Sequence, residues 1–468
     1  MTLSVATARA QLKKNVKTSS TTPVVCICGG GNGAHVTAGY LASKGIRVHV
    51  LTRKPELWAE EIRITTKGSS WEDKGDIVGR LTMVTSSAKN AIPTADIIFV
   101  AAPANAHPAI LEKIAPFLKP GSILGALFAQ GGFDWAAKRA LGSVALDSLH
   151  LLFGLQNIPW ICKATSYGKE AKIIGPKKCL YVAAYPVERM DVAARVMEDL
   201  FDIPCATVAN FLNLTLTPSN QIIHPARYFA IFRDWDGKKT YSHAELAARR
   251  GLTLCTNPLI LCHVTLSYDV IVDADFDEFS AEQLSMLDNE LQQVKLALLQ
   301  RFPALDLSDV LPMDARVIKQ YGDDVSDRSS LKAIFASNLG YAGCNTPLKE
   351  ISPGQFHPAV DSRCVCSTFR IVLTRRRLFW EDIPYGLCIL KNMAEMLGNF
   401  PTPRIDFMIR WHQQFMQVQF LNGDNQLNPR ELWRTGAPNK YGIHDIADLV
   451  ETSLPREMHG YRHPRSRM

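Results

Sequence analysis

The N-terminal part of the chain alternates short apolar runs with stretches of helical periodicity. The apolar runs occupy residues 24–28, 46–51, 96–102, 122–129 and 149–153. Each run is short and rich in β-forming residues, as expected for a strand that is buried on both faces. Strands that alternate with helices are typical of βαβ units around a parallel sheet. We therefore predict an α/β domain over residues 23–205.

Helical spacing dominates the second part of the chain. Residues 276–302 place apolar side chains at helical intervals, with Ser280 as the expected N-cap and Gln283 at the capping-box position. Further helices are predicted over residues 387–397 and 405–420. This texture predicts a second domain that is mostly helical.

These patterns divide the chain into four predicted segments. They are a flexible leader at 1–22, an α/β domain at 23–205, a helical domain at 206–440 and a tail at 441–468. Residues 422–438 are rich in Asn, Pro and Gly and are predicted to form a loop.

A glycine-rich segment follows the first predicted strand. Its register Gly29-x-Gly31-x-x-Ala34 fits the dinucleotide fingerprint, with alanine in place of the third glycine. Gly29 permits a tight turn, Gly31 lets a pyrophosphate approach the backbone, and Ala34 lets the next helix pack closely on the strand. That helix, predicted over 34–44, directs its N-terminal N–H groups at the phosphates. The alternative is a glycine-rich turn without a ligand.

The end of the second predicted strand bears on the choice of cofactor. NAD-preferring proteins of this type usually carry Asp or Glu there, to bind the ribose 2′-hydroxyl. This chain has Thr52, Arg53 and Lys54 instead. An arginine can bind a 2′-phosphate, although a solvated basic turn is the simpler interpretation. The prediction is NADP or NAD, with a preference for NADP.

Composition narrows the classes of protein that remain. No apolar run is long enough to span a bilayer, so no membrane helix is expected. The net charge of +7 is mild for 468 residues, and no basic patch is interleaved with aromatic residues, so nucleic-acid binding is not expected. The 11 cysteines are scattered, which favours reduced thiols inside a cell. No metal site is expected, since no second cysteine pair stands at zinc-finger spacing.

The two ends of the chain suggest a location. Residues 1–22 contain no Asp or Glu, which fits a disordered leader or, alternatively, a transit peptide. The final residues Ser466, Arg467 and Met468 resemble the S-K-L type of peroxisomal address. They predict a peroxisomal import receptor as a partner and a peroxisome or similar organelle as the location. A cytoplasmic location is the alternative.

Candidate catalytic and binding residues lie in the loops after the strands and in two segments of the helical domain. Loops at the carboxyl ends of parallel strands line the cofactor crevice, and here these are residues 103–107, 130–133 and 154–157. In the helical domain, His224 lies in S-N-Q-I-I-H-P and Asp382 in W-E-D-I-P-Y-G. Taken singly, such a histidine is usually structural and such an aspartate is usually a helix cap.

Taken together, these segments resemble the opine dehydrogenase family, which includes octopine and nopaline dehydrogenases. The motifs G-G-G-N-G-A-H, P-A-x-A-H, N-x-x-x-H-P, E-D-I-P-Y-G and P-T-P with I-D occur in the family's order over residues 24–419. The resemblance implies a Rossmann domain joined to an all-α domain of the 6-phosphogluconate dehydrogenase C-terminal type. It also implies NAD(P)H-dependent condensation of an amino acid with a 2-oxo acid such as pyruvate.

The resemblance also assigns roles to individual residues. His224 is the acid/base, and Asp382 orients its ring and stabilises the imidazolium. The cofactor-binding residues are Gly29, Gly31, Asn32, Gly33, Ala34, Arg53 and Arg377. Gln130 resembles a residue near the 2-oxo acid, whereas Asn157 and Cys162 belong to a segment that shapes the amino-acid pocket.

The same segment contains a departure from the family pattern. Members that use arginine are expected to carry a carboxylate here, but this chain offers Leu155, Gln156 and Asn157. A neutral or small amino acid is therefore as consistent with the sequence as arginine. Two rival functions are a ketopantoate reductase or glycerol-3-phosphate dehydrogenase-type enzyme with a single 2-oxo or 2-hydroxy substrate, and a dinucleotide sensor without catalysis.

Overall fold

The chain divides into two compact units. The computed structural model describes residues 23–249, 269–271, 276–341, 345–358, 360–365, 371–375, 377–451 and 453–454. Unit 1 comprises Met1–Ala102, Ala106–Ala129 and Ala136–Thr207, and unit 2 comprises Pro103–Asn105, Gln130–Trp135 and Val208–Met468. The predicted leader and the C-terminal tripeptide lie outside the described residues.

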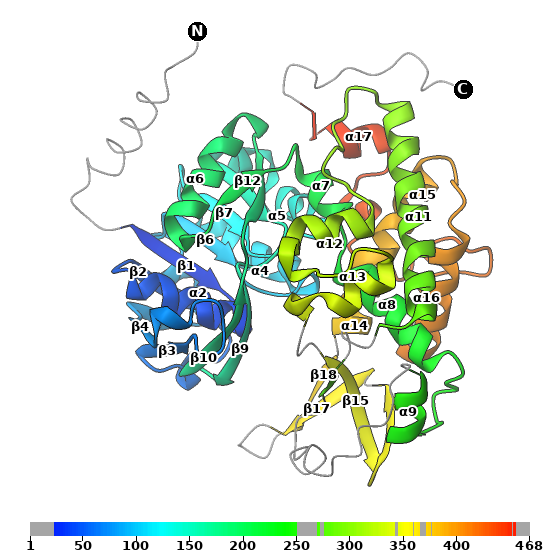
Figure 1. Ribbon diagram of the computed structural model, residues 1–468. Helices are drawn as coiled ribbons and strands as arrows, with labels where there is room; N and C mark the ends of the chain where they lie inside the picture. Colours follow the sequence, from blue (N-terminus) through cyan, green and yellow to red (C-terminus); the bar gives the residue numbers. More distant parts are fainter. Residues whose placement is uncertain are drawn as a thin grey trace. The chain divides into compact units, whose positions relative to one another are not determined.

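Unit 1 is built on an eight-stranded sheet of order β12-β11-β8-β7-β6-β1-β2-β5, of which strands β12, β7, β6, β1 and β2 are labelled in Figure 1. Its strands are β1 (Val24–Cys28), β2 (Arg47–Leu51), β5 (Met83–Thr85), β6 (Ile97–Val100), β7 (Ile123–Ala126), β8 (Leu151–Leu155), β11 (Leu180–Tyr185) and β12 (Cys205–Thr207). Its helices are α2 (Asn32–Ser43), α3 (Ala88–Ala91), α4 (His107–Ile114), α5 (Phe133–Ser148) and α6 (Met190–Phe201). The five predicted strands are confirmed as β1, β2, β6, β7 and β8.

The pairing is parallel from β8 to β5, as predicted, but β11 runs antiparallel to β8. The cause lies in the connection between them. The chain leaves β8 into the hairpin β9 (Trp160–Ser166) and β10 (Glu170–Pro176), without the crossover helix that a parallel neighbour requires. Unit 1 is therefore an α/β domain whose sheet changes direction at β11.

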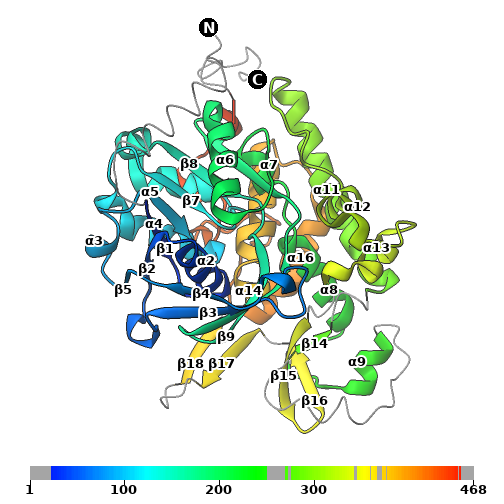
Figure 2. The same ribbon diagram turned by 60° about the vertical axis from the view of Figure 1, so that its left-hand side comes forward.

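A second sheet, which the sequence analysis did not predict, has the order β4-β3-β10-β9 and includes β3 (Glu61–Thr65) and β4 (Ile77–Arg80). Helix α2 packs against strands of both sheets (Figure 2). Its residues 34–41 are all buried, as expected for a helix that is covered by a sheet on each side. The helix and β4 approach closely at Gly79, where a Cβ atom would lie 2.0 Å from the carbonyl oxygen of Gly39.

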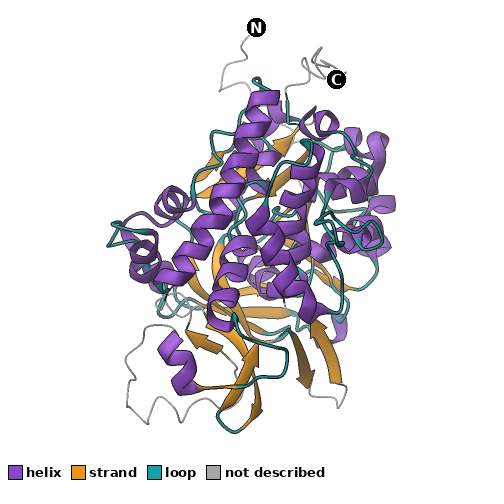
Figure 3. Cartoon of the chain, turned by 90° about the vertical axis from the view of Figure 1, so that its right-hand side faces the viewer, coloured by secondary structure: helices purple, strands orange, loops and turns teal. Residues whose placement is uncertain are grey.

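Unit 2 is mainly helical, as predicted (Figure 3). Its α-helices are α7 (Phe211–Thr215), α8 (Asn220–Phe232), α9 (His243–Arg249), α11 (Glu278–Arg301), α12 (Met313–Tyr321), α13 (Leu331–Ser337), α14 (Arg377–Trp380), α15 (Cys388–Met396), α16 (Pro403–Met416) and α17 (Ile446–Glu451). A small antiparallel sheet adds β13 (Tyr241–Ser242), β14 (Asp269–Ile271), β15 (Asn345–Ser352) and β16 (Gln355–Pro358), and a hairpin adds β17 (Asp361–Val365) and β18 (Ile371–Arg375). Helix α17 lies within the predicted tail, and none of the described helices is long and apolar enough to cross a membrane.

The predicted cap of α11 is wrong. Asp277, not Ser280, is the N-cap, and its Oδ1 accepts a hydrogen bond from the Ser280 backbone N–H at 2.7 Å. Ser280 is fully buried, and its hydroxyl accepts a hydrogen bond from Arg227 at 2.7 Å. The helix therefore begins three residues earlier than a serine cap requires, because an aspartate caps equally well.

The P-T-P segment and Asp406 hold α15 against α16. Lys391 of α15 forms an ion pair with Asp406 of α16, with a distance of 2.9 Å between Nζ and Oδ1. Thr402 donates a hydrogen bond from its hydroxyl to the same carboxylate at 3.3 Å. Both charged side chains are nearly buried, so the carboxylate needs both partners. This pair fixes the helix that directly follows the E-D-I-P-Y-G segment.

Candidate functional site

The glycine loop after β1 is shaped by two different steric demands. The Gly29 N–H donates to the Leu51 carbonyl at 3.0 Å, and a Cβ atom on Gly29 would lie 2.2 Å from the carbonyl oxygen of Ala101. Glycine is therefore required at position 29 by the packing of the sheet. A Cβ atom on Gly31 would meet nothing within 4 Å. Position 31 faces open space, as a cradle for a pyrophosphate requires.

The N-terminus of α2 is suited to an anion. Gly31 is its N-cap, no side chain caps it, and its first turn contains no acidic residue. Ala34 is fully buried, which confirms the close packing expected of that helix. The exposed side chain of Asn32 accepts a hydrogen bond from the Ala164 N–H at 3.0 Å. An uncapped helix end with positive dipole charge fits the phosphates of NAD or NADP.

The loop is locked by a histidine to which the sequence analysis gave no role. The Gly168 N–H donates to His35 Nε2 at 2.7 Å, so Nδ1 carries the ring hydrogen and donates to the Gly31 carbonyl at 2.8 Å. The ring stacks on Trp58, with 4.2 Å between ring centroids. Burial lowers the pKa of His35, which favours this neutral tautomer. The final letter of G-G-G-N-G-A-H was the available signal.

We expect Gly31→Val to lose NADH affinity and Gly29→Ala to lose thermal stability. Gly31→Val places a side chain where a pyrophosphate would lie, so NADH binding should weaken at least about tenfold with an unchanged melting temperature. Gly29→Ala forces a Cβ atom onto the Ala101 carbonyl, so the melting temperature itself should fall. Fluorescence titration with NADH and a thermal melt measure the two effects. An unchanged NADH affinity in Gly31→Val would contradict the prediction that the pyrophosphate binds against the backbone of Gly31.

For two of the predicted cofactor-binding residues, the structure gives a position but does not test their role. Arg53 is exposed and lies two residues after the end of β2, and its part in cofactor choice stays a prediction. Arg377 begins α14, but its side chain lies outside the described part of the structure.

The predicted acid/base pair lies within unit 2. His224 is on α8, and Asp382 is the N-cap of a π-helical turn at Ile383–Leu387. Although the two residues are 158 positions apart, His224 Nδ1 lies 2.7 Å from Asp382 Oδ2. The Asp382 side chain is 3% exposed and the His224 side chain is 32% exposed. An ionised carboxylate only accepts hydrogen bonds, so Nδ1 carries the hydrogen and the lone pair of the neutral ring lies on Nε2.

A second buried carboxylate stands beside the pair. Glu381 is 1% exposed, and its Oε1 accepts a hydrogen bond from the Ala104 N–H at 2.8 Å. This contact joins residues 277 positions apart and fixes the Pro103–Asn105 segment to the E-D-I-P-Y-G segment. Glu381 could not be predicted as a site residue, because a hydrogen bond to a distant backbone N–H leaves no local pattern in the sequence.

Gln130 belongs to the same cluster. Its Oε1 accepts a hydrogen bond from the Ser219 N–H at 3.4 Å, at the start of α8. At the next residue, a Cβ atom on Gly131 would lie 3.2 Å from the Tyr385 carbonyl oxygen. Residues 130–133, called the Gln130 loop below, therefore pack between the start of α8, which carries His224, and the turn that Asp382 caps.

The other two predicted substrate residues lie in unit 1. Asn157 follows β8 and is half-buried. Cys162 lies on β9, packs against the core of unit 1, and has a thiol whose pKa burial raises to about 12. Their role in an amino-acid pocket stays a prediction.

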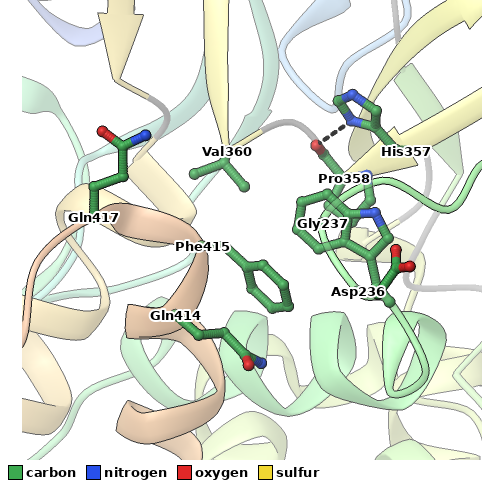
Figure 4. Close-up of a pocket in the computed structure, with 9 residues that line it drawn as sticks. Asp236, Gly237, His357, Pro358, Val360, Gln414, Phe415 and Gln417 are labelled. Atoms are coloured by element: carbon green, nitrogen blue, oxygen red, sulfur yellow. Dashed lines mark hydrogen bonds between the residues drawn. The ribbon is translucent and has the colours of Figure 1, made fainter.

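A separate pocket of about 560 Å³ in unit 2 contains none of the predicted site residues (Figure 4). It is lined by Trp235, Asp236, Gly237, His357, Pro358, Val360, Gln414, Phe415 and Gln417. The Trp235 and Phe415 rings lie 4.3 Å apart and form its aromatic wall. Among the described residues, no group of three or more His, Cys, Asp or Glu side chains is placed to hold a metal ion.

Known proteins match most of the chain. The family described as "NAD/NADP octopine/nopaline dehydrogenase, alpha-helical domain" matches residues 207–416. A tauropine dehydrogenase from Arabella iricolor is 27% identical over 439 residues, which cover 91% of this chain and 100% of that protein. An opine dehydrogenase from Haliotis discus hannai is 28% identical over 447 residues, covering 91% and 98% of the two chains.

The fold agrees with these matches. A solved structure of octopine dehydrogenase in complex with NADH and agmatine superimposes with a TM-score of 0.72 at 23% identity, covering 94% of this chain and 100% of that one. The resemblance found in the sequence is thus confirmed: residues 207–416 match the helical domain of the octopine/nopaline dehydrogenase family, and 91% of the chain is similar to opine dehydrogenases, which are NAD(P)-dependent oxidoreductases that act on CH–NH donors.

Proposed function

We propose that the protein condenses the amino group of an amino acid with a 2-oxo acid such as pyruvate and reduces the product with NAD(P)H to an opine. The reverse oxidation would follow the same path. The observation that carries this proposal is the 2.7 Å contact between His224 and Asp382. Relatives named tauropine, opine and octopine dehydrogenase support the reaction class.

The pair supplies the proton transfers that the condensation needs. The amine attacks C2 of the 2-oxo acid, and the nitrogen must lose a proton as the carbinolamine forms. His224 Nε2 accepts that proton and passes it to the C2 oxygen, which becomes the carbinolamine hydroxyl. By the same route it carries the second N–H proton to this hydroxyl, which leaves as water and gives the imine. Asp382 holds Nδ1–H and stabilises the imidazolium between the two transfers. When bound, the nicotinamide supplies the hydride that reduces the C=N bond.

The amino donor is the open part of this proposal. The segment at Leu155, Gln156 and Asn157 contains no carboxylate for a guanidinium. The relatives carry the names of different opines, which is consistent with variation of the donor within the family. We propose a neutral or small amino acid as well as arginine for the substrate screen.

A coupled-substrate assay tests the proposal. Purified protein is mixed with NADH or NADPH, pyruvate and each member of an amino-acid panel that includes arginine. We expect cofactor oxidation only when both pyruvate and an amino acid are present. Oxidation with pyruvate alone would favour a single-substrate reductase, and dinucleotide binding without turnover would favour a sensor.

Cofactor preference provides a further prediction. If Arg53 binds the 2′-phosphate of NADP, Arg53→Asp should reduce kcat/KM for NADPH relative to NADH by about tenfold or more, since an ionic hydrogen bond is replaced by repulsion. Lys169→Asp, which changes an exposed lysine of unit 1 elsewhere, is the control. An unchanged NADPH-to-NADH ratio in Arg53→Asp would show that the basic turn is only solvated.

We also propose peroxisomal import through Ser466, Arg467 and Met468, which match the chemistry of the address. A fluorescent protein fused to the N-terminus should enter peroxisomes, and deletion of the three residues should leave it in the cytoplasm. A cytoplasmic signal from the undeleted fusion would contradict import.

A further inference from the structure

A lysine and a tyrosine meet beside the Gln130 loop. Lys440 Nζ donates to the Tyr385 phenol oxygen and to the Thr435 carbonyl, each at 3.0 Å. The same ammonium lies 5.2 Å from the Tyr385 ring centroid and 5.1 Å from that of Tyr441. Residues 435–441 lie in the part of the chain where the sequence predicted little more than a loop. The contact therefore joins this late segment to the turn that Asp382 caps.

Tyr385 connects the ammonium to the reaction centre. It lies three residues after Asp382, on the same π-helical turn. On its other side it touches the Gln130 loop, since a Cβ atom on Gly131 would lie 3.4 Å from Tyr385 Cβ. Gly436 completes the packing, because a Cβ atom there would lie 2.8 Å from Tyr385 Cδ1 and 3.0 Å from the Gly131 carbonyl oxygen. The segment that carries Lys440 therefore packs, through Gly436 and Tyr385, against the loop predicted to bind the 2-oxo acid.

The phenol is placed as a donor. Its oxygen accepts from Lys440, and within the described part of the chain its own O–H has no other hydrogen-bond partner. Burial, with a smaller contribution from the charge of Glu381, raises the pKa of Tyr385. The phenol therefore keeps its proton across the physiological range and can donate it to an incoming anion.

The positive charge of Lys440 offsets the repulsion that nearby carboxylates exert on an anionic substrate. Glu381 and Asp382 are adjacent and both buried, so their charges oppose the entry of a carboxylate. Every 2-oxo acid carries at least one carboxylate, and an opine formed from pyruvate and an α-amino acid carries at least two. A positive charge beside the turn offsets this repulsion, and a charge-assisted hydrogen bond is among the strongest that a protein offers to a carboxylate.

We infer that Lys440 and the Tyr385 hydroxyl bind the carboxylate of the 2-oxo acid. This inference rests on the proposed function and names the part of the chain that recognises the acid. The two residues select a 2-oxo acid over a neutral carbonyl compound of the same shape. Lys440 also holds residues 435–441 in place through the Thr435 carbonyl. The test must therefore separate binding of the substrate carboxylate from this structural role.

The test compares pyruvate with pyruvamide, in which a neutral amide replaces the carboxylate. For each variant, kcat/KM is measured with both compounds at saturating amino acid and NADH. In Lys440→Gln the preference for pyruvate over pyruvamide should fall about tenfold or more, because only the charged substrate loses its partner. Lys440→Arg should keep most of the preference. Lys332→Gln, which removes an exposed charge of unit 2, should leave it unchanged.

A role in support alone gives a different result. If Lys440 only holds residues 435–441 in place, turnover of both compounds falls equally and the preference is unchanged, which overturns the inference. Tyr385→Phe provides a second variant if Lys440→Gln does not fold. It removes the O–H and keeps the lysine, and the preference should fall several-fold. An unchanged preference in Tyr385→Phe also counts against the inference.

Calorimetric titration of pyruvate into the protein–NADH complex separates this inference from the proposed function. If the wild-type protein binds pyruvate, Lys440→Gln should bind it about tenfold or more weakly, whether or not the correct amino donor has been found. Normal turnover with unchanged pyruvate affinity in Lys440→Gln overturns the carboxylate site and leaves the proposed function standing. A wild-type protein that neither binds pyruvate nor turns it over overturns both.

Discussion

Replacing His224 with alanine should lower kcat for opine formation by about 100- to 10,000-fold, the range that a positioned acid/base contributes. The dissociation constant for NADH should stay within about twofold of the wild-type value, because the glycine cradle lies in unit 1 and His224 lies in unit 2. Stopped-flow absorbance at 340 nm measures the first quantity, and fluorescence titration measures the second.

His444→Ala is the matched control for this experiment. His444 is an exposed histidine of unit 2, so its loss should leave both kcat and NADH affinity unchanged. A His224→Ala protein with kcat within about threefold of the wild type would remove His224 from the chemistry. Loss of NADH binding in that variant would point instead to a structural defect.

Asp382→Asn should lower kcat by about 100-fold or more, with little change in shape. The amide is nearly the size of the carboxylate, but it lacks the charge that stabilises an imidazolium and it can present a donor to Nδ1. The side chain is buried and lies 2.7 Å from the ring, so water cannot readily replace the lost interaction. Asp424→Asn, at an exposed position of unit 2, should have no effect.

The double variant sharpens this prediction. If Asp382 acts through His224, adding Asp382→Asn to His224→Ala should cost little further activity, since residues that act as a unit are strongly non-additive. A double variant whose loss equals the product of the two single losses would indicate independent roles. Steady-state kcat of the four proteins, each checked for an unchanged melting temperature, provides the comparison.

Local patterns predicted much of the fold. The strands that became β1, β2, β6, β7 and β8 are short apolar runs, and such runs are visible in the sequence alone. The second sheet was missed although β3 reads E-I-R-I-T, with the alternating burial of a half-covered strand. Its partner β10 lies far along the chain, and a sequence pattern does not show which distant strands will pair.

The same contrast holds for the site. The glycine cradle could be predicted because all of its parts fall within a few residues of β1. The approach of His224 to Asp382 was implied only by family resemblance, since neither residue stands out in its own segment. The bond from Ala104 to Glu381 and the anchoring of Lys440 by Tyr385 were not predicted. They depend on tertiary packing that brings separate loops to a single turn.

Formation of the carbon–nitrogen bond is the most direct test of the account. The enzyme is supplied with NADH or NADPH, [2-¹³C]pyruvate and a ¹⁵N-labelled amino-acid mixture, and the products are followed by ¹³C NMR. We expect a new C2 signal that is split by one-bond coupling to ¹⁵N, and that is absent with His224→Ala. A C2 signal of a 2-hydroxy acid without ¹⁵N coupling, or pyruvate left unchanged with every amino acid, would contradict the proposed reaction.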